Sequence, residues 1–345
     1  MEKRRVHISE CMDDDVLAED IINLNGMLVL SANTVFNQYI IQRLADYGID
    51  YVWVSSIQKE DLPYKNYHIF EKKYEKSIKE MKQLILDLIK GKKVDYAVIG
   101  NITKTILSAW EEPEHVIRCL GSIRDSDDYT YYHCVNVSFY SMLIAGWLNL
   151  AKDDVKTVIQ AGLLHDIGKV KVPGKLLNKE GKLSGREFEE IKRHAIYGYE
   201  LVKGTAELSE EVKDAILMHH EREDKSGYPL KAGGDDLSIY TKIIAVADVF
   251  DAMTSNRPYR KALTPFSAFD EFLTICAMRL DINIIKALIH NLSRYYMGSS
   301  VLLSNGQTAN IAYVPPHCVC KPIVDTGSGF LDLSREKELS IVGMI

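Results

Sequence analysis

The chain has 345 residues, of which 46% are hydrophobic and 26% charged, a balance typical of a globular protein rather than a disordered one. Its net charge of −6, from 42 basic and 48 acidic residues, excludes the overall positive field that recruits long nucleic acids. A small anion could still bind a local basic cluster. We therefore expect no long nucleic acid partner.

We expect neither a membrane-spanning segment nor a secretory signal from this sequence. No stretch reaches about 18 uninterrupted apolar residues, so we expect no membrane insertion. Six cysteines are scattered without the spacing of a disulfide framework, which favours reduced thiols in a cytoplasmic protein. His317, Cys318 and Cys320 could contribute to a zinc site, but further ligands are missing nearby.

Residues 1–58 predict a small α+β domain. The dipeptide Asn25-Gly26 favours a tight hairpin turn between segments of alternating apolar character. A helix is expected over residues 33–47, where a glycine follows its C-terminal end, and a strand over residues 51–54.

The rest of the chain predicts a helical body with a small β-rich end. Residues 59–93 are expected to form a charged linker that passes into a helix. Over residues 94–297 nearly every segment has the apolar period of a helix, and His133 lies on one such apolar face. Residues 298–345 change to short alternating runs, which predict a β-rich C-terminal appendage. The fold class is therefore mainly α.

A histidine and an aspartate, His165 and Asp166, interrupt an otherwise apolar helix. They stand between Leu164 and Ile167. A buried aspartate in such surroundings faces a desolvation cost of several kcal/mol unless a cation or strong hydrogen-bond donors meet it. A metal ion is the natural candidate.

Further candidate ligands lie in the same helical region: His133, His194, His219, His220 and Asp248. Taken singly, each has an ordinary alternative as a core histidine, a surface histidine or a capping acid. Nitrogen and carboxylate ligands together suit iron, manganese or zinc rather than magnesium or calcium. More than four ligands indicates two ions, with Asp166 able to bridge them through its two oxygens.

The order of these histidines and aspartates along the chain resembles the HD-GYP family of HD-domain phosphohydrolases. The resemblance covers roughly residues 127–268 and rests on these residues: His133, His165-Asp166, His194, His219-His220, Gly227-Tyr228-Pro229 and Asp248. A plain HD domain would need only the first histidine, the His-Asp doublet and the late aspartate. The three additional histidines and the Gly-Tyr-Pro loop make the resemblance specific.

The resemblance implies a fold, an activity and cofactors. The fold is an all-α HD-type helical bundle over residues 94–297, which would be the catalytic domain. The activity is hydrolysis of cyclic di-GMP to linear pGpG, with onward cleavage to GMP left open. The cofactors are two divalent transition-metal ions, with iron or manganese favoured, and a metal-activated hydroxide would attack the phosphorus. All seven histidine and aspartate residues of the motif would be metal ligands.

The resemblance also places Lys169 beside the reacting phosphate. Lys169 would contact the scissile phosphate and assist the leaving oxygen, whereas its ordinary alternative is a solvated lysine just past a helix. It would share one helix face with Asp166 if the helix continued through Gly168. Asp166 and Lys169 are therefore the catalytic candidates. Asp251, one turn after Asp248, is expected to orient Lys169 or a ligand without binding metal itself.

Substrate contacts are expected from Tyr228, Arg257 and Arg260. Gly227 permits an unusual backbone turn and Pro229 stiffens the exit, so that Tyr228 is presented at a defined angle to the substrate or a partner. The two arginines offer planar donors suited to phosphate or guanine edges. As isolated surface arginines they would have no special role.

The sequence departs from the family pattern at a few positions. Members that bind three metals carry a glutamate where this chain has Tyr129, and Asp127 and Asp128 lie at a different helical phase. We therefore favour two metals over three. Lys225 replaces a usual glycine, and Glu223 stands where an aromatic residue is common.

Two alternatives to a cyclic di-GMP phosphodiesterase stay open. One is a phosphohydrolase for another nucleotide, including a mixed cyclic dinucleotide, because no residue reads guanine unambiguously. The other is a sensor that binds a cyclic dinucleotide without turnover. A homodimer, or a signalling protein bound through the N-terminal domain, would be the protein partner.

Overall fold

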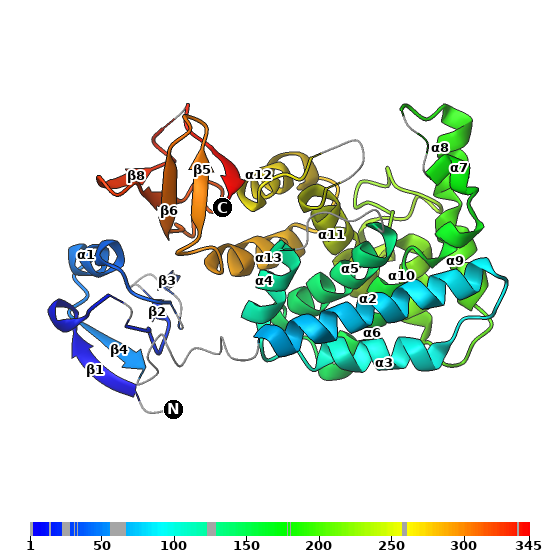
Figure 1. Ribbon diagram of the computed structural model, residues 1–345, viewed down its shortest axis with the longest axis horizontal. Helices are drawn as coiled ribbons and strands as arrows, with labels where there is room; N and C mark the ends of the chain where they lie inside the picture. The colour runs from blue at the N-terminus through cyan, green and yellow to red at the C-terminus, as the bar shows by residue number, and fades with distance from the viewer. Residues whose placement is uncertain are drawn as a thin grey trace. The chain divides into compact units, whose positions relative to one another are not determined.

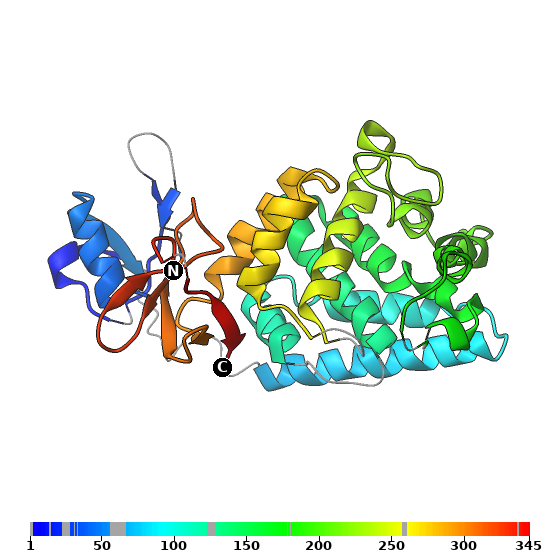
Figure 2. The same ribbon diagram turned by 90° about the horizontal axis from the view of Figure 1, so that it is seen from above.

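The chain forms two compact units. The computed structural model describes residues 3–13, 15–22, 28–30, 32, 34–55, 67–122, 129–177, 179, 181–256, 261–336 and 338–345. The first unit comprises residues 1–67, 264–269 and 290–345, and the second comprises residues 68–263 and 270–289. Figures 1 and 2 show the β-strands in the first unit and a bundle of helices in the second.

The N-terminal part of the first unit combines short strands with one helix. Its elements are β1 (Lys3–His7), η1 (Ile8–Glu10), β2 (Ile21–Ile22), β3 (Leu28–Leu30), α1 (Gln38–Asp46) and β4 (Tyr51–Ser55). Antiparallel pairing joins β1 to β4 and β2 to β3. Alternate residues of β4, Val52 and Val54, are buried in a core with Phe36, Ile40 and Leu44, as the period of a strand requires. The predicted α+β character of this region is confirmed.

Helix α1 is shorter than the predicted helix at residues 33–47. Asn37 caps it, because its side-chain oxygen accepts a hydrogen bond from the Ile40 amide at 2.9 Å. Val35 just before it forms an isolated β-bridge with Val16 instead of helix. Gly48 follows the helix at φ +72°, as predicted, and the dipeptide at residues 25–26 lies outside the described residues.

The C-terminal part of the first unit is an antiparallel sheet. Its strands are β5 (Ser300–Leu303), β6 (Thr308–Tyr313), β7 (Ile323–Asp325), β8 (Phe330–Asp332) and β9 (Ile341–Met344), in the order β8-β7-β6-β5-β9. Gly306, at φ +85°, makes the turn between β5 and β6. This sheet confirms the predicted β-rich appendage.

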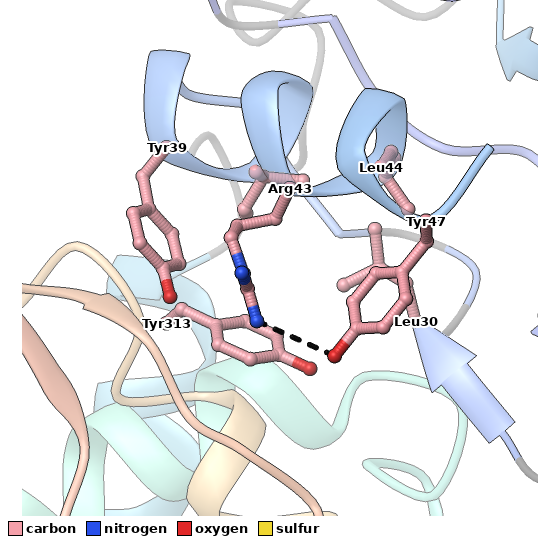
Figure 3. Close-up of a pocket in the computed structure, with 7 residues that line it drawn as sticks. Leu30, Tyr39, Arg43, Leu44, Tyr47 and Tyr313 are labelled. Carbon is pink, nitrogen blue, oxygen red and sulfur yellow. Dashed lines mark hydrogen bonds between the residues drawn. The ribbon is translucent and has the colours of Figure 1, made fainter. Parts of the chain in front are cut away.

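A small pocket lies between α1 and β6 in the first unit (Figure 3). Its lining residues are Leu30, Tyr39, Ile40, Arg43, Leu44, Tyr47 and Tyr313. Arg43 reaches between Tyr39 and Tyr47, and its Nη2 donates to Tyr47 Oη at 3.4 Å. Burial raises the pKa of Tyr313 to about 12, so this phenol stays protonated. The pocket contains none of the predicted site residues, which all lie in the second unit or outside the described residues.

The second unit is built around helix α5. The helices that follow along the chain are α2 (Tyr67–Ile89), α3 (Tyr96–Leu107), α4 (Pro113–Ser122), α5 (Tyr129–Trp147), α6 (Lys152–Leu164), α7 (Gly174–Leu177), α8 (Gly185–Lys192), α9 (His194–Val202), α10 (Glu210–Met218), α11 (Ile239–Thr254), α12 (Pro265–Glu271) and α13 (Ile282–Arg294). Two 3-10 helices, η4 (Ile167–Lys171) and η5 (Gly234–Asp236), and a π-helix, η6 (Phe272–Cys276), lie between them. Most of α12 and the end of α13 belong to the first unit. Every residue of α5 from 133 to 145 is buried, so it is the central helix rather than a helix with one buried face.

The mainly α fold predicted from the sequence is confirmed. Helices α5, α6 and α11 pack against one another at the centre, and α2 runs along the bundle in both Figure 1 and Figure 2. None of the helices in the described part of the chain combines the length and the apolar character needed to cross a bilayer.

Close packing of α5 on α6 depends on Gly162. A Cβ at this position would lie 2.8 Å from the Ser138 Cα, which is backbone and cannot move aside cheaply. We expect Gly162→Ala to lower the free energy of unfolding by about 1–3 kcal/mol, as overpacking typically does. Gly100→Ala in α3 is the matched control, because a Cβ there meets nothing within 4 Å. The control should raise stability by roughly 0.5–1 kcal/mol in urea unfolding; equal effects of the two changes would contradict the packing argument.

Candidate metal centre

The His-Asp doublet lies where α6 ends. Helix α6 ends at Leu164, His165 caps it, and η4 begins after Asp166. The helix therefore does not continue through Gly168, contrary to the geometry expected for Lys169, and a tight 3-10 turn takes its place. A Cβ on Gly168 would lie 1.9 Å from the His194 carbonyl oxygen, so only glycine allows η4 to lie this close to α9.

The other candidate ligands come from four further elements. His133 is on α5, His194 is the first residue of α9, His219 and His220 follow the end of α10, and Asp248 is on α11. Apart from His220, which is partly exposed, each of these residues is buried. The bundle thus brings together seven side chains that are far apart in the sequence.

These seven side chains form two groups, and within each group the donor atoms all lie within 4.8 Å of one another. One group is Asp166, His194, His219 and His220, and the other is His133, His165 and Asp248. Each group has the size and the donor types of a transition-metal site. His317, Cys318 and Cys320 form no such group within the described part of the chain.

The two oxygens of Asp166 face different groups. Oδ1 lies 3.3 Å from His194 Nε2, whereas Oδ2 lies 3.4 Å from His165 Nε2 and 3.5 Å from His133 Nε2. A carboxylate in this position can give one oxygen to each of two ions. It is 3% exposed, so the charge it carries is almost fully desolvated.

Hydrogen bonds at the outer ring nitrogens direct three imidazole lone pairs inward. The Nδ1 atoms of His165, His194 and His219 lie 2.7–2.8 Å from main-chain carbonyl oxygens, which can only accept. Each Nδ1 therefore carries a proton, and Nε2 is the nitrogen that each ring presents to the centre. His194 Nε2 and His219 Nε2 are 3.2 Å apart. Two lone pairs at this distance repel unless a cation lies between them.

The charge states at the centre also favour cations. Burial lowers the pKa of His194 and of His219, and it lowers the pKa of His220 to about 3. These three rings are therefore neutral. Burial alone would raise the pKa of Asp248, but the hydrogen bond and charge of His133 outweigh it and hold that pKa well below the usual range. Neutral nitrogens beside ionised carboxylates are the donor set that iron, manganese and zinc bind.

His133 is held from its outer side by a carboxylate. Its Nδ1 lies 2.7 Å from Asp251 Oδ2, and its Nε2 lies 3.1 Å from Asp248 Oδ1. Burial lowers the pKa of His133, but the hydrogen bonds to Asp248 and Asp251 raise it to about 9. Asp251 thus contacts a candidate ligand, as expected, and not Lys169. A carboxylate on the outer nitrogen is the usual way in which a protein orients a ligating histidine.

Lys169 lies beside Asp166. Its Nζ donates to Asp166 Oδ2 at 2.5 Å, and its side chain is 26% exposed. Burial lowers the pKa of Lys169, but the charge of Asp166 outweighs this effect and raises it, so the amine stays protonated. A positive charge is therefore kept at the edge of the site.

The Gly-Tyr-Pro loop packs back on the histidine doublet. A Cβ on Gly227 would lie 2.4 Å from both Glu221 Cα and the His220 carbonyl oxygen, so this glycine is required for space. The turn at Gly227 does not use a positive φ; the left-handed residues nearby are Lys225 at φ 61° and Lys231 at φ 58°. The Tyr228 ring lies 4.7 Å from the His220 ring at 33° and covers it, and the peptide bond to Pro229 is cis.

Some predicted residues lie outside the described part of the chain. These are Arg257, Arg260, Asp127 and Asp128, and nothing is described of the Tyr129 side chain. Conversely, the sequence analysis missed Asn136, whose Nδ2 donates to Asp251 Oδ1 at 2.9 Å. Its position three residues after His133 places it on the same face of α5 and could have indicated it.

Comparison with protein families agrees with this geometry. Residues 123–284 match the family model described as HD domain. This part of the chain is therefore similar to HD domains. The match spans the histidines, the His-Asp doublet and the late aspartate at the centre of the bundle, and it confirms the resemblance drawn from the sequence.

Known proteins with a similar HD domain include named phosphodiesterases. A Pseudomonas aeruginosa protein named cyclic di-GMP phosphodiesterase is 33% identical over 217 residues, which are 63% of this chain and 52% of that protein. A Vibrio cholerae protein named 3′3′-cGAMP-specific phosphodiesterase 3 is 37% identical over 151 residues, which are 44% of this chain and 33% of that protein. The chain thus spans a third to a half of the length of these relatives.

Most of the chain has a solved counterpart in its fold. Bd1817, described as a HDG"Y"P protein from Bdellovibrio bacteriovorus, has a TM-score of 0.53 and covers 83% of this chain and 98% of its own at 14% identity. This likeness extends beyond the HD domain and shows the fold.

The left-handed conformation of Lys225 explains why a glycine is usual there. A residue with a Cβ in the left-handed conformation costs about 1–2 kcal/mol. Glycine removes this strain but loses part of the benefit, because its unfolded state has more conformational freedom. We expect Lys225→Gly to raise the free energy of unfolding by roughly 0.5–1 kcal/mol in urea titrations. Lys182→Gly is the control, since Lys182 is exposed and its φ is not positive. A loss of stability in Lys225→Gly would contradict this explanation.

Proposed function

We propose that the chain is a metal-dependent phosphodiesterase that hydrolyses cyclic di-GMP to linear pGpG. The observation that carries the proposal is the position of Asp166, whose two oxygens face two separate groups of histidine and aspartate donors. Two adjacent cation sites are suited to a phosphodiester, because both the attacking and the leaving oxygen develop negative charge. The relatives named cyclic di-GMP phosphodiesterases support this substrate.

The residues present fit two divalent transition-metal ions, with iron or manganese favoured. Asp166, His194, His219 and His220 would hold one ion, while Asp166, His133, His165 and Asp248 would hold the other. Bound ions would supply positive charge for the phosphoryl oxygens and promote ionisation of the attacking water. The chain itself provides buried imidazoles whose orientation is fixed by main-chain carbonyls.

Lys169 and Tyr228 are the described residues proposed to meet the substrate. The Lys169 ammonium stays charged beside Asp166 and can donate to a phosphoryl or leaving oxygen. The Tyr228 ring, stacked on His220, offers an aromatic face and a phenol at the edge of the site. Arg257 and Arg260 are proposed as further substrate contacts by the family resemblance alone.

A mixed cyclic dinucleotide is the second candidate substrate. It is favoured by relatives named 3′3′-cGAMP-specific phosphodiesterases, which match the chain at 31–37% identity. The proposed metal ligands would not distinguish the two substrates, since bound ions would meet the phosphodiester and not the bases. Choice between them would depend on residues that meet the bases.

A substrate panel tests the proposal. Metal-free protein is loaded anaerobically with iron or manganese and incubated with cyclic di-GMP, 3′3′-cGAMP and cyclic di-AMP, and the linear products are measured. We expect linear product from cyclic di-GMP that disappears in Asp166→Asn, which keeps the shape of the side chain but removes its charge. Faster turnover of 3′3′-cGAMP would favour the second candidate. Tight binding without any product from the metal-loaded protein would reject hydrolysis and leave a sensor.

Removal of the Lys169 charge should affect turnover more than metal binding. We expect Lys169→Met to lower kcat by about 10²-fold, the usual size of losing one charged donor at a reacting phosphate, while metal content stays at the wild-type level. Lys171→Met is the control, because Lys171 belongs to the same turn η4 but is exposed. If both variants keep wild-type kcat, Lys169 has no part in the reaction.

A further inference from the structure

A buried chain of hydrogen bonds leads from helix α2 to His133. Tyr74 Oη donates to Asn136 Oδ1 at 2.6 Å, and Asn136 Nδ2 donates to Asp251 Oδ1 at 2.9 Å. Asp251 Oδ2 lies 2.7 Å from His133 Nδ1. All four residues are buried, with exposed fractions of 0% for Tyr74, 5% for Asn136, 1% for Asp251 and 2% for His133. Bulk water therefore does not compete for these hydrogen bonds.

The direction of each hydrogen bond follows from the groups involved. Burial raises the pKa of Tyr74 well above its usual value, so its phenol is protonated and can donate. The Asn136 amide must then turn its oxygen to Tyr74 and its NH₂ to Asp251, because the opposite orientation would place two acceptors against each other. Asp251 Oδ1 also accepts from Ser255 Oγ at 3.1 Å. The carboxylate is thus fixed from several sides.

Spacing on two facing helices produces this arrangement. His133 and Asn136 are three residues apart on α5, and Asp248 and Asp251 are three residues apart on α11, so each pair lies on one helix face. Asp251 meets both residues of the α5 pair, and His133 meets both residues of the α11 pair. Tyr74 adds a third helix to this contact.

We propose that Tyr74 and Asn136 are positioning residues for the metal centre: they fix Asp251, which holds the His133 ring with Nε2 toward His165 and Asp248. The inference rests on the proposed function, because it takes His133 as a metal ligand. Tyr74 lies before residues 123–284, the HD domain match, so the helix that precedes this domain takes part in shaping its centre.

Packing alone does not require the Tyr74 hydroxyl. The ring packs against Phe139, with ring centroids 5.8 Å apart, and a phenylalanine would make the same contact. The hydroxyl donates to the buried oxygen of Asn136, and the NH₂ group of the same amide holds Asp251. Its loss would leave the oxygen of Asn136 buried without a donor, which favours rotation of the amide away from the carboxylate.

The series of hydrogen bonds that begins at Tyr74 reaches only one of the two donor groups, the one that contains His133. His194 and His219 in the other group are held by the carbonyl oxygens of Ile191 and Ile216, which belong to the main chain. Disturbing Tyr74 should therefore loosen the group that contains His133 and leave the other group unchanged. This asymmetry separates positioning from a general loss of stability.

Titration of metal-free protein with Mn²⁺ tests the inference in Tyr74→Phe. We expect one of two Mn²⁺ ions to bind about 3- to 10-fold more weakly, a smaller effect than the 10- to 100-fold typical when a direct partner of a ligand is lost, and the other ion to bind as in the wild type. The Mn²⁺ concentration for half-maximal activity should rise, while kcat at saturating Mn²⁺ and KM stay near their wild-type values. Asn136→Ala should weaken binding of the same Mn²⁺ ion. The double variant should bind it little more weakly than either single variant, because both changes break the same series of hydrogen bonds.

Phe70→Leu is the control for packing. Phe70 is buried on α2 and its ring lies 5.5 Å from the same Phe139 ring, but it makes no hydrogen bond in the chain that ends at His133. We expect this variant to lower Tm and to keep both Mn²⁺ affinities. Unchanged affinities in Tyr74→Phe, or equal weakening in Phe70→Leu, would overturn the positioning role. A wild-type protein that binds no Mn²⁺ would instead overturn the proposed metal centre, and this inference with it.

Discussion

The buried charge of Asp166 is the constraint on which the helical unit depends. A carboxylate that is 3% exposed, with one oxygen facing the Nε2 of the neutral His194 ring, is unfavourable without compensating positive charge. His133, whose pKa is raised to about 9, lies 3.5 Å from the other oxygen. Lys169 supplies one positive charge at a single oxygen. The remaining donors converge in two groups, each of which would hold one of the two proposed metal ions.

The fold meets this constraint by placing each donor at the end of a helix or on a helix next to the centre. His165, His219 and His194 lie at helix termini, where their outer nitrogens can donate to main-chain carbonyls three residues earlier. His133 and Asp248 lie within α5 and α11 rather than at a helix end. A side-chain carboxylate, Asp251, takes the place of the carbonyl there. Two ways of orienting a ligand thus coexist in one centre.

The sequence predicted the residues of this centre better than their surroundings. Histidines and aspartates within apolar helices stand out because burying them is costly, and their order along the chain resembled a known family. The end of α6 before Asp166 was not predicted, because the requirement for glycine at position 168 comes from α9, which is distant in sequence. Tyr74 was missed for a similar reason: its sequence context is a charged helix, and only tertiary packing shows where its hydroxyl points.

The first unit was predicted in outline from turn and strand patterns. Gly48 and Gly306 are at positive φ as the patterns required, whereas the start of α1 depends on the bridge between Val16 and Val35, which joins distant residues. Sequence patterns of this kind locate turns well because the cause is local. They locate helix starts less well when strand pairing competes for the same residues.

Anomalous diffraction from crystals of the manganese-loaded protein is the most direct measurement of the central claim. The account predicts two manganese peaks per chain, one among Asp166, His194, His219 and His220 and one among His133, His165 and Asp248, with an oxygen of Asp166 bound to each. A single peak, or two peaks of which one lacks Asp166 as a ligand, would contradict it.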